Sequence, residues 1–120
     1  MIAIVVVAVF FAGMGLFGLA APAALVRPLG IQATGPHART EVRAVYGGFG
    51  LAIAAVLVVA AVDEEIRRGA VIAVAIALAG MAAGRLVGRV FDRPAAFYPI
   101  WFYFWVEVFL AAVLWFARGA

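Results

Sequence analysis

Four long apolar segments are the strongest constraint on what this chain can fold into. They cover residues 2–26, 42–62, 69–90 and 97–117, and each reaches about the 20 residues with which an α-helix crosses a bilayer core roughly 30 Å thick. The chain is 69% hydrophobic and 12% charged, whereas a soluble domain carries about a quarter charged residues. Backbone polar groups in lipid must be bonded within the segment, which favours helices. The sequence therefore predicts an all-α integral membrane protein.

Short connections between these segments predict one domain over residues 1–120, folded as an up-down-up-down four-helix bundle. The first connection spans residues 27–40, and Thr40 is expected to cap the second helix. Residues 63–68 are expected to form a tight charged turn, and the third connection covers residues 91–96. No basic residue precedes the first segment, which also exceeds the apolar stretch of a signal peptide, so we expect a retained helix.

Small residues recur at helical spacing in three of the segments, which predicts close helix packing inside the bundle in preference to a homodimer motif. These residues are Gly15 and Gly18 in the first segment, Gly47, Gly50 and Ala54 in the second, and Gly80, Gly84 and Gly88 in the third.

Glu107 lies near the midpoint of the fourth segment. An ionisable group at that depth costs a few kcal/mol unless it is paired, protonated or hydrated. Arg85 should lie roughly 10 Å below the third connection and Glu107 roughly 15 Å below the same membrane face, as judged from the helix rise. Because an Arg side chain bridges such a gap, we expect Arg85 and Glu107 to form a buried pair.

Further polar residues lie on the helix faces near this pair. Arg85, Arg89 and Asp92 share one face of the third helix. The sequence predicts a polar funnel that opens at the first and third connections and narrows toward Glu107. Its ligand-binding residues would be Arg43, Tyr46, Arg85, Arg89 and Glu107, with Glu41 and Asp92 at the mouth. In the alternative interpretation, Arg89 extends to lipid headgroups and the Arg85–Glu107 pair fixes helix register.

Several classes of chemistry lack the residues that they need. The chain has no Cys and one His, His37, so neither a thiolate site nor an imidazole metal cluster is expected. No nucleophile–base pair or cofactor loop is visible, so we expect no enzyme, no metal and no cofactor. The basic residues form no soluble face, which argues against nucleic acid; at the ends of the apolar segments they suit anionic lipid headgroups.

The arginines also bear on location and orientation. All nine basic residues are Arg, a usage typical of a GC-rich bacterial genome. The sequence thus predicts a multi-pass protein of the bacterial inner membrane. More Arg residues flank the first and third connections than the opposite side, which predicts that both termini are non-cytoplasmic.

An ordered set of residues resembles a known family. It comprises Glu41-Val-Arg-Ala-Val-Tyr-Gly-Gly-Phe-Gly50, Gly84-Arg-Leu-Val-Gly88, Asp92-Arg-Pro94 and Glu107. The chain resembles a bacterial family of small four-helix membrane proteins, the domain of unknown function 4345, and more broadly the DoxX-type four-helix bundles. The resemblance covers nearly the whole chain. It implies the fold and the positions of the site residues, but no activity.

Three classes of function fit these features. The first is a protein that binds or handles an amphiphilic or lipid-like anion in the Arg- and Glu-lined funnel. The second is an accessory or structural subunit of a larger membrane protein complex. The third, a proton-coupled exporter of the small-multidrug type, needs an acid in the first helix, which holds none.

Overall fold

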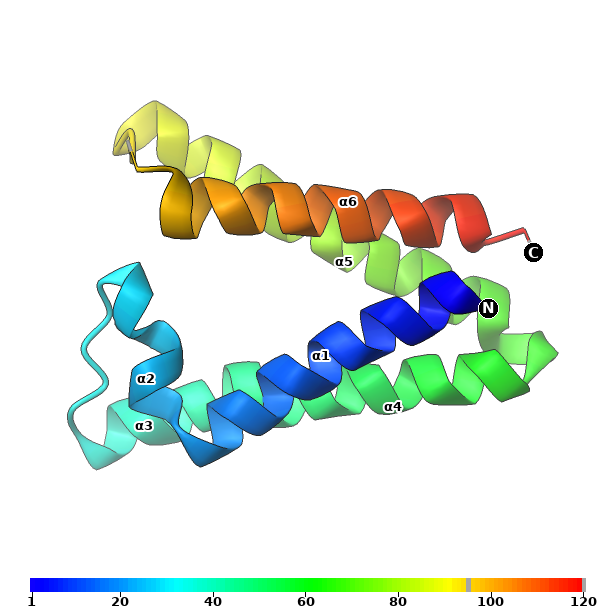
Figure 1. The fold of residues 1–120 in the computed structure, drawn as a ribbon, viewed down its shortest axis with the longest axis horizontal. Helices are drawn as coiled ribbons and strands as arrows, with labels where there is room; N and C mark the ends of the chain where they lie inside the picture. The colour runs from blue at the N-terminus through cyan, green and yellow to red at the C-terminus, as the bar shows by residue number, and fades with distance from the viewer. Residues whose placement is uncertain (95, 120) are drawn as a thin grey trace.

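The computed structural model describes residues 1–94 and 96–119, and within these ranges the regular structure is helical, with no strand. Four helices are long and apolar enough to cross a membrane: Ile2–Ala20, Pro36–Val62, Glu64–Phe91 and Phe97–Ala117. Consecutive members of this set run in opposite directions (Figure 1). The predicted all-α fold is confirmed, and the protein has the length and composition of one that crosses a membrane four times.

Two of the four helices contain π-helical segments near the connections. The elements in chain order are α1 (Ile2–Ala20), α2 (Pro22–Val26), η1 (Arg27–Leu29), α3 (Pro36–Val42), η2 (Arg43–Gly48), α4 (Phe49–Val62), α5 (Glu64–Phe91), η3 (Phe97–Trp101) and α6 (Phe102–Ala117). The second spanning helix thus consists of α3, η2 and α4, and η2 is a π-helical stretch inside it. The fourth consists of η3, also π-helical, and α6.

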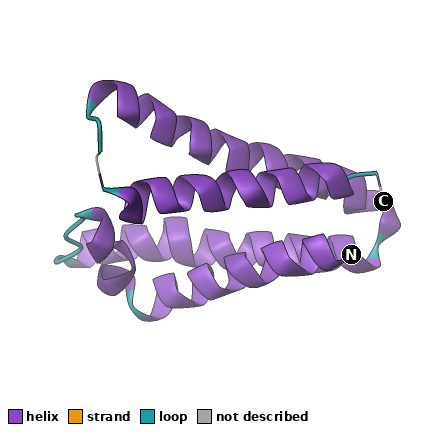
Figure 2. Ribbon diagram, turned by 45° about the horizontal axis from the view of Figure 1, so that its top comes forward, coloured by secondary structure: helices purple, strands orange, loops and turns teal. Residues whose placement is uncertain are grey.

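The helices pack as two antiparallel pairs. α1 lies along α4 and α5 lies along α6, while contacts between α4 and α5 and between α1 and α6 join the pairs. The pairs are close at the end that holds both termini and diverge toward α2 and η3 (Figure 1). α5 and α6 also separate from each other toward the third connection (Figure 2).

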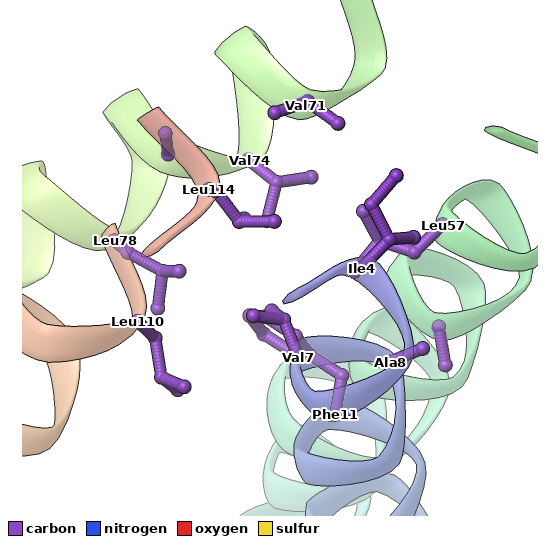
Figure 3. Close-up of a cluster of buried hydrophobic side chains, with 12 residues drawn as sticks. Ile4, Val7, Ala8, Phe11, Leu57, Val71, Val74, Leu78, Leu110 and Leu114 are labelled. Atoms are coloured by element: carbon purple, nitrogen blue, oxygen red, sulfur yellow. The ribbon is translucent and has the colours of Figure 1, made fainter. Parts of the chain in front are cut away.

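The hydrophobic core occupies the half of the bundle nearest the termini. All four spanning helices contribute to it (Figure 3), with fully or nearly fully buried side chains at Ile4, Val7, Phe11, Leu57, Val71, Val74, Leu78, Leu110 and Leu114. A second, smaller cluster of Val26, Ala33 and Val42 lies at the first connection. The part of α5 after Leu78 and the part of α6 before Val106 are outside both clusters.

Glycines allow α1 and α4 to approach closely. A Cβ atom built on Gly50 would lie 3.1 Å from Gly15 Cα, and one built on Gly18 would lie 2.9 Å from Gly47 N. The predicted packing role of these glycines is confirmed. The same prediction is wrong for the third helix, because a Cβ atom on Gly80, Gly84 or Gly88 would meet nothing within 4 Å.

Two predicted helix boundaries at the first connection are wrong. The first helix, predicted to extend to residue 26, ends at Ala20. Ala21 leaves helical geometry (φ −140°, ψ 65°), and Pro22, which lacks an N–H, begins the short helix α2. The second helix begins at Pro36 instead of residue 42, so Thr40 lies inside it and Gly35 occupies the N-cap position.

The predicted charged turn at residues 63–68 is also wrong, since α5 begins at Glu64 instead of residue 69. Asp63 is the N-cap, and its Oδ1 accepts a hydrogen bond from Glu65 N at 3.0 Å. Arg67 donates to the carbonyls of Ala60 and Ala61 at 2.9 and 3.1 Å. These charged residues therefore cap the ends of α4 and α5, and α5 extends to Phe91, one residue past the prediction. The fourth helix has the predicted bounds, Phe97–Ala117.

Candidate functional site

A bidentate ion pair joins α5 to α6. Arg85 Nε and Nη2 donate to Glu107 Oε1 and Oε2 at 2.8 and 2.9 Å. The side chain of Glu107 is 3% exposed, whereas that of Arg85 is 21% exposed. The predicted pair is therefore present, with the two parallel hydrogen bonds that make Arg–carboxylate contacts both strong and directional. Because Arg85 is the more accessible partner, the polar atoms of the pair that reach the surface belong to Arg85.

The Arg85 guanidinium has N–H groups beyond those that Glu107 accepts. A guanidinium carries five N–H donors, and the two bonds to Glu107 use two of them. Within residues 1–94 and 96–119, every buried side-chain N or O atom has a hydrogen-bond partner. No such partner is found for Nη1 among these residues, so Nη1 lies at an accessible surface and not in the packed interior.

One tyrosine ring lies close to the Arg85 guanidinium. Arg85 Cζ lies 5.7 Å from the centroid of the Tyr103 ring, within the range of a cation–π contact. Arg85 thus lies against one carboxylate and one aromatic ring, which hold the planar cation in a fixed orientation.

A groove of about 490 Å³ runs beside Arg85. It is lined by Met81, Gly84, Arg85, Gly88, Asp92, Pro94 and Ile100. The α5 members recur every three or four residues and so share one face of the helix. Gly84 and Gly88 have no atom within 4 Å of a hypothetical Cβ, so their missing side chains leave the groove open.

Arg43 does not line this groove. Its Nε donates to Leu19 O at 3.1 Å, at the end of α1. In a continued helix, the carbonyls of Gly18 and Leu19 would accept from residues 22 and 23. Since Pro22 has no N–H and the chain bends at Ala21, these carbonyls are released. Arg43 therefore caps the C-terminus of α1, a role that the predicted funnel did not include.

The other predicted residues divide between two places. Asp92 lines the groove with Arg85, whereas Glu41 and Tyr46 line a separate hollow of about 380 Å³ near the first connection. Arg89 is exposed and lines neither. The prediction of a single funnel is wrong in this respect. Helix rise brings Arg85 and Glu107 to levels at which they meet, but the rotation of each helix and the separation of the two pairs decide which side chains share a cavity.

Sequence reasoning missed several residues of the groove. Met81, Gly84 and Gly88 lie on the same helical face as Arg85, and this spacing was a signal that would have found them. Pro94 and Ile100 carried no such signal, because they follow the end of α5. Trp101 Nε1 donates to Pro94 O at 2.8 Å, which ties the third connection to η3 beside the groove.

The arrangement suits binding by hydrogen-bond donation more than bond-making chemistry. In the part of the chain that the structure describes, no group of three or more His, Cys, Asp or Glu side chains has the geometry to hold a metal ion. The accessible edge of Arg85 offers donors to an oxygen of a bound molecule, beside the apolar side chains of Met81 and Ile100. Sites for small molecules are commonly built this way, with a few polar groups in an apolar setting.

The fold and the site define a helical protein of membrane-spanning composition with a partly buried Arg–Glu pair between its last two helices. The chain belongs to the family described as Domain of unknown function (DUF4345), whose model matches residues 1–118. Among curated proteins and solved structures, none matches the chain. The predicted family is thus confirmed, while the broader likeness to DoxX-type bundles stays a prediction.

Proposed function

We propose that this protein binds an amphiphilic anion in the groove along α5, with the head group of the ligand on Arg85. The observation that supports this proposal is the unequal exposure of the two side chains in the ion pair, 21% for Arg85 and 3% for Glu107. Glu107 holds the guanidinium from the buried side, which leaves its other edge for a ligand. A purely structural pair has no need for an accessible edge beside a groove.

The length and chemistry of the groove favour a ligand with an apolar tail. From Met81 to Asp92, α5 rises about 16 Å, the length of a medium alkyl chain. Met81 lies one turn deeper than Arg85, and Asp92 lies two turns nearer the third connection. The tail would therefore lie along Gly84 and past Met81, with the polar head between Arg85 and the membrane surface, at the level of Gly88.

Charge balance favours a head group with one negative charge. Glu107 neutralises Arg85 within the pair, and the Asp92 carboxylate also lines the groove. A multiply charged phosphate would be repelled by Asp92 more strongly than a carboxylate. A fatty acid or similar monoanion is the ligand class that best fits these charges.

A binding experiment with a filled groove tests this proposal. Purified protein in a maltoside detergent is titrated with a fatty acid, and thermal stability is followed; a ligand of the folded state raises the melting temperature by mass action. Gly84→Leu should abolish the rise by filling the groove. Gly80→Leu is the matched control, because Gly80 also has open space but lies outside the groove. The proposal fails if wild type shows no rise or if both variants retain it.

The alternative is an accessory subunit of a larger membrane complex. One observation favours it: the ridge of Gly80, Gly84 and Gly88 faces open space, and such ridges permit close approach of another helix. Co-purification of a protein partner, abolished by both Gly80→Leu and Gly84→Leu, would support this function. The two functions thus predict opposite behaviour for Gly80→Leu.

The cellular membrane and the orientation of the chain in it are also part of the proposal. We place the protein in a bacterial inner membrane with both termini outside the cytoplasm, supported by the Arg residues that flank the first and third connections. That side would also hold the mouth of the groove.

A further inference from the structure

The second hollow, near the first connection, has a chemistry of its own. Its volume is about 380 Å³, within the usual range for small-molecule sites. It is lined by Val26, Ile31, Ala33, Ala38, Glu41, Val42, Val45 and Tyr46. Six of these side chains are aliphatic, one is aromatic and one is a carboxylate. The α3 and η2 members recur at spacings of three and four residues, so one face of this helix forms one wall.

The exposed carboxylate of Glu41 forms no ion pair with any residue that the structure describes. Within residues 1–94 and 96–119, the ion pair found is Arg85–Glu107. The basic residues nearest in sequence, Arg39 and Arg43, are each two positions from Glu41. Residues two apart do not face each other on a helix. Both arginines also donate to backbone carbonyls, Arg39 to Thr34 O at 2.6 Å and Arg43 to Leu19 O at 3.1 Å.

The elements around the hollow are held in place without a ligand. The buried side chains of Val26, Ala33 and Val42 pack together, and Ala38 and Tyr46 pack against them. α2 lies beside α3 (Figure 1), so the walls come from segments on both sides of the first connection. A site whose walls are already packed loses little free energy to ordering when a ligand binds.

We propose that this hollow binds a small amphiphilic amine. Its ammonium group would donate to the Glu41 carboxylate, the half-buried Tyr46 would offer a ring face and a hydroxyl to the same cation, and the aliphatic walls would bury the apolar part. An anion would meet an unneutralised carboxylate, so this site selects the opposite charge from the groove at Arg85. At 380 Å³ the hollow suits a free amine better than a whole phospholipid. The inference does not depend on the proposed anion site.

Methyl NMR of alanine in an uncharged maltoside detergent tests this assignment. The probes are hexylammonium, hexanol and hexanoate, which share one apolar chain and differ in charge. Hexylammonium should give saturable shifts at the methyl groups of Ala33 and Ala38, with none at the exposed Ala83 on α5. Hexanol should bind about tenfold more weakly, the size of one lost charge-assisted hydrogen bond. Hexanoate should bind more weakly still.

Two variants and a control sharpen the test. Glu41→Gln should weaken hexylammonium binding about tenfold. Glu65→Gln should leave it unchanged, since Glu65 is an exposed acid at the opposite end of the bundle. Val45→Phe, at a lining residue that is 51% exposed, should narrow the hollow without disturbing the core. Equal binding of hexanol and hexylammonium, or an unchanged affinity in Glu41→Gln, would overturn the proposal.

A competition experiment with lipids distinguishes a free amine from the ammonium head group of a phospholipid. Phosphatidylethanolamine added to the detergent should leave the hexylammonium affinity unchanged. Competition by this lipid, absent with phosphatidylglycerol, would overturn the assignment to a free amine and make the lipid head group the occupant.

Discussion

Arg85 on α5 and Glu107 on α6 are joined by two parallel hydrogen bonds, at 2.8 and 2.9 Å, at the edge of the hydrophobic core. The pair therefore joins two helices that separate from each other toward the third connection (Figure 2). Removing either partner leaves the other charge without its counter-ion at membrane depth.

The first prediction concerns this pair. Arg85→Gln and Glu107→Gln should each lower the free energy of unfolding by about 1–4 kcal/mol. The double variant should lose less than the sum, because it leaves no unpaired charge. Denaturant unfolding in detergent measures all three. Strictly additive losses would show that the two residues do not interact.

The pair was predictable because few residues of this chain carry charge, and fewer still lie deep in an apolar segment. Two such residues at similar depth on neighbouring helices leave little choice of partner. The end of α1 was less predictable, since residues 21–26 remain apolar and hydropathy does not mark the bend at Ala21. The groove depends on how far α5 and α6 separate. This separation is a property of tertiary packing that the glycine spacing alone does not distinguish from close contact.

The second prediction compares two glycines of different surroundings. Gly50→Ala should destabilise the protein by about 1–3 kcal/mol, because its Cβ would lie 3.1 Å from Gly15 Cα and from Phe11 O. These are backbone atoms, which cannot rotate away. Gly80→Ala meets open space and should be neutral or stabilise by about 0.5–1 kcal/mol, since Ala favours a helix. Thermal unfolding of the two variants measures the difference, and similar changes in both would contradict the packing described.

The third prediction concerns Arg43, which was expected to bind a ligand but instead caps the C-terminus of α1. Arg43→Ala should destabilise the protein by about 0.5–1.5 kcal/mol, the net value of one hydrogen bond, because it leaves Leu19 O without this donor. The response to a fatty acid should persist, since Arg43 does not line the groove. If the variant is as stable as wild type but its melting temperature does not rise with a fatty acid, Arg43 takes part in ligand binding. Arg68→Ala, at an exposed position on α5, serves as the control for loss of one positive charge.

The fourth prediction concerns the single residue between α4 and α5. Asp63→Ala should cost about 0.5–2 kcal/mol, because Asp63 Oδ1 accepts from Glu65 N and caps α5. Asp63→Asn should retain most of the stability, since its side-chain oxygen can accept the same bond. Far-UV circular dichroism on heating follows all variants. Equal losses for Ala and Asn would attribute the effect to charge instead of the cap.

The last prediction is the orientation of the chain. Both termini and the α4–α5 turn lie at one end of the molecule (Figure 1), so a fusion at either terminus reports on the same side. The first and third connections have Arg27, Arg39, Arg43, Arg89 and Arg93 nearby, against Arg67, Arg68 and Arg118 at the other end. Positive residues favour the cytoplasm. Alkaline phosphatase fused to either terminus should therefore be active in bacterial cells, and a fluorescent protein that folds in the cytoplasm should stay dark. Fluorescence at both termini would reverse the orientation. It would also place the mouth of the groove outside the cytoplasm, where its ligand would have to arrive from the periplasmic side.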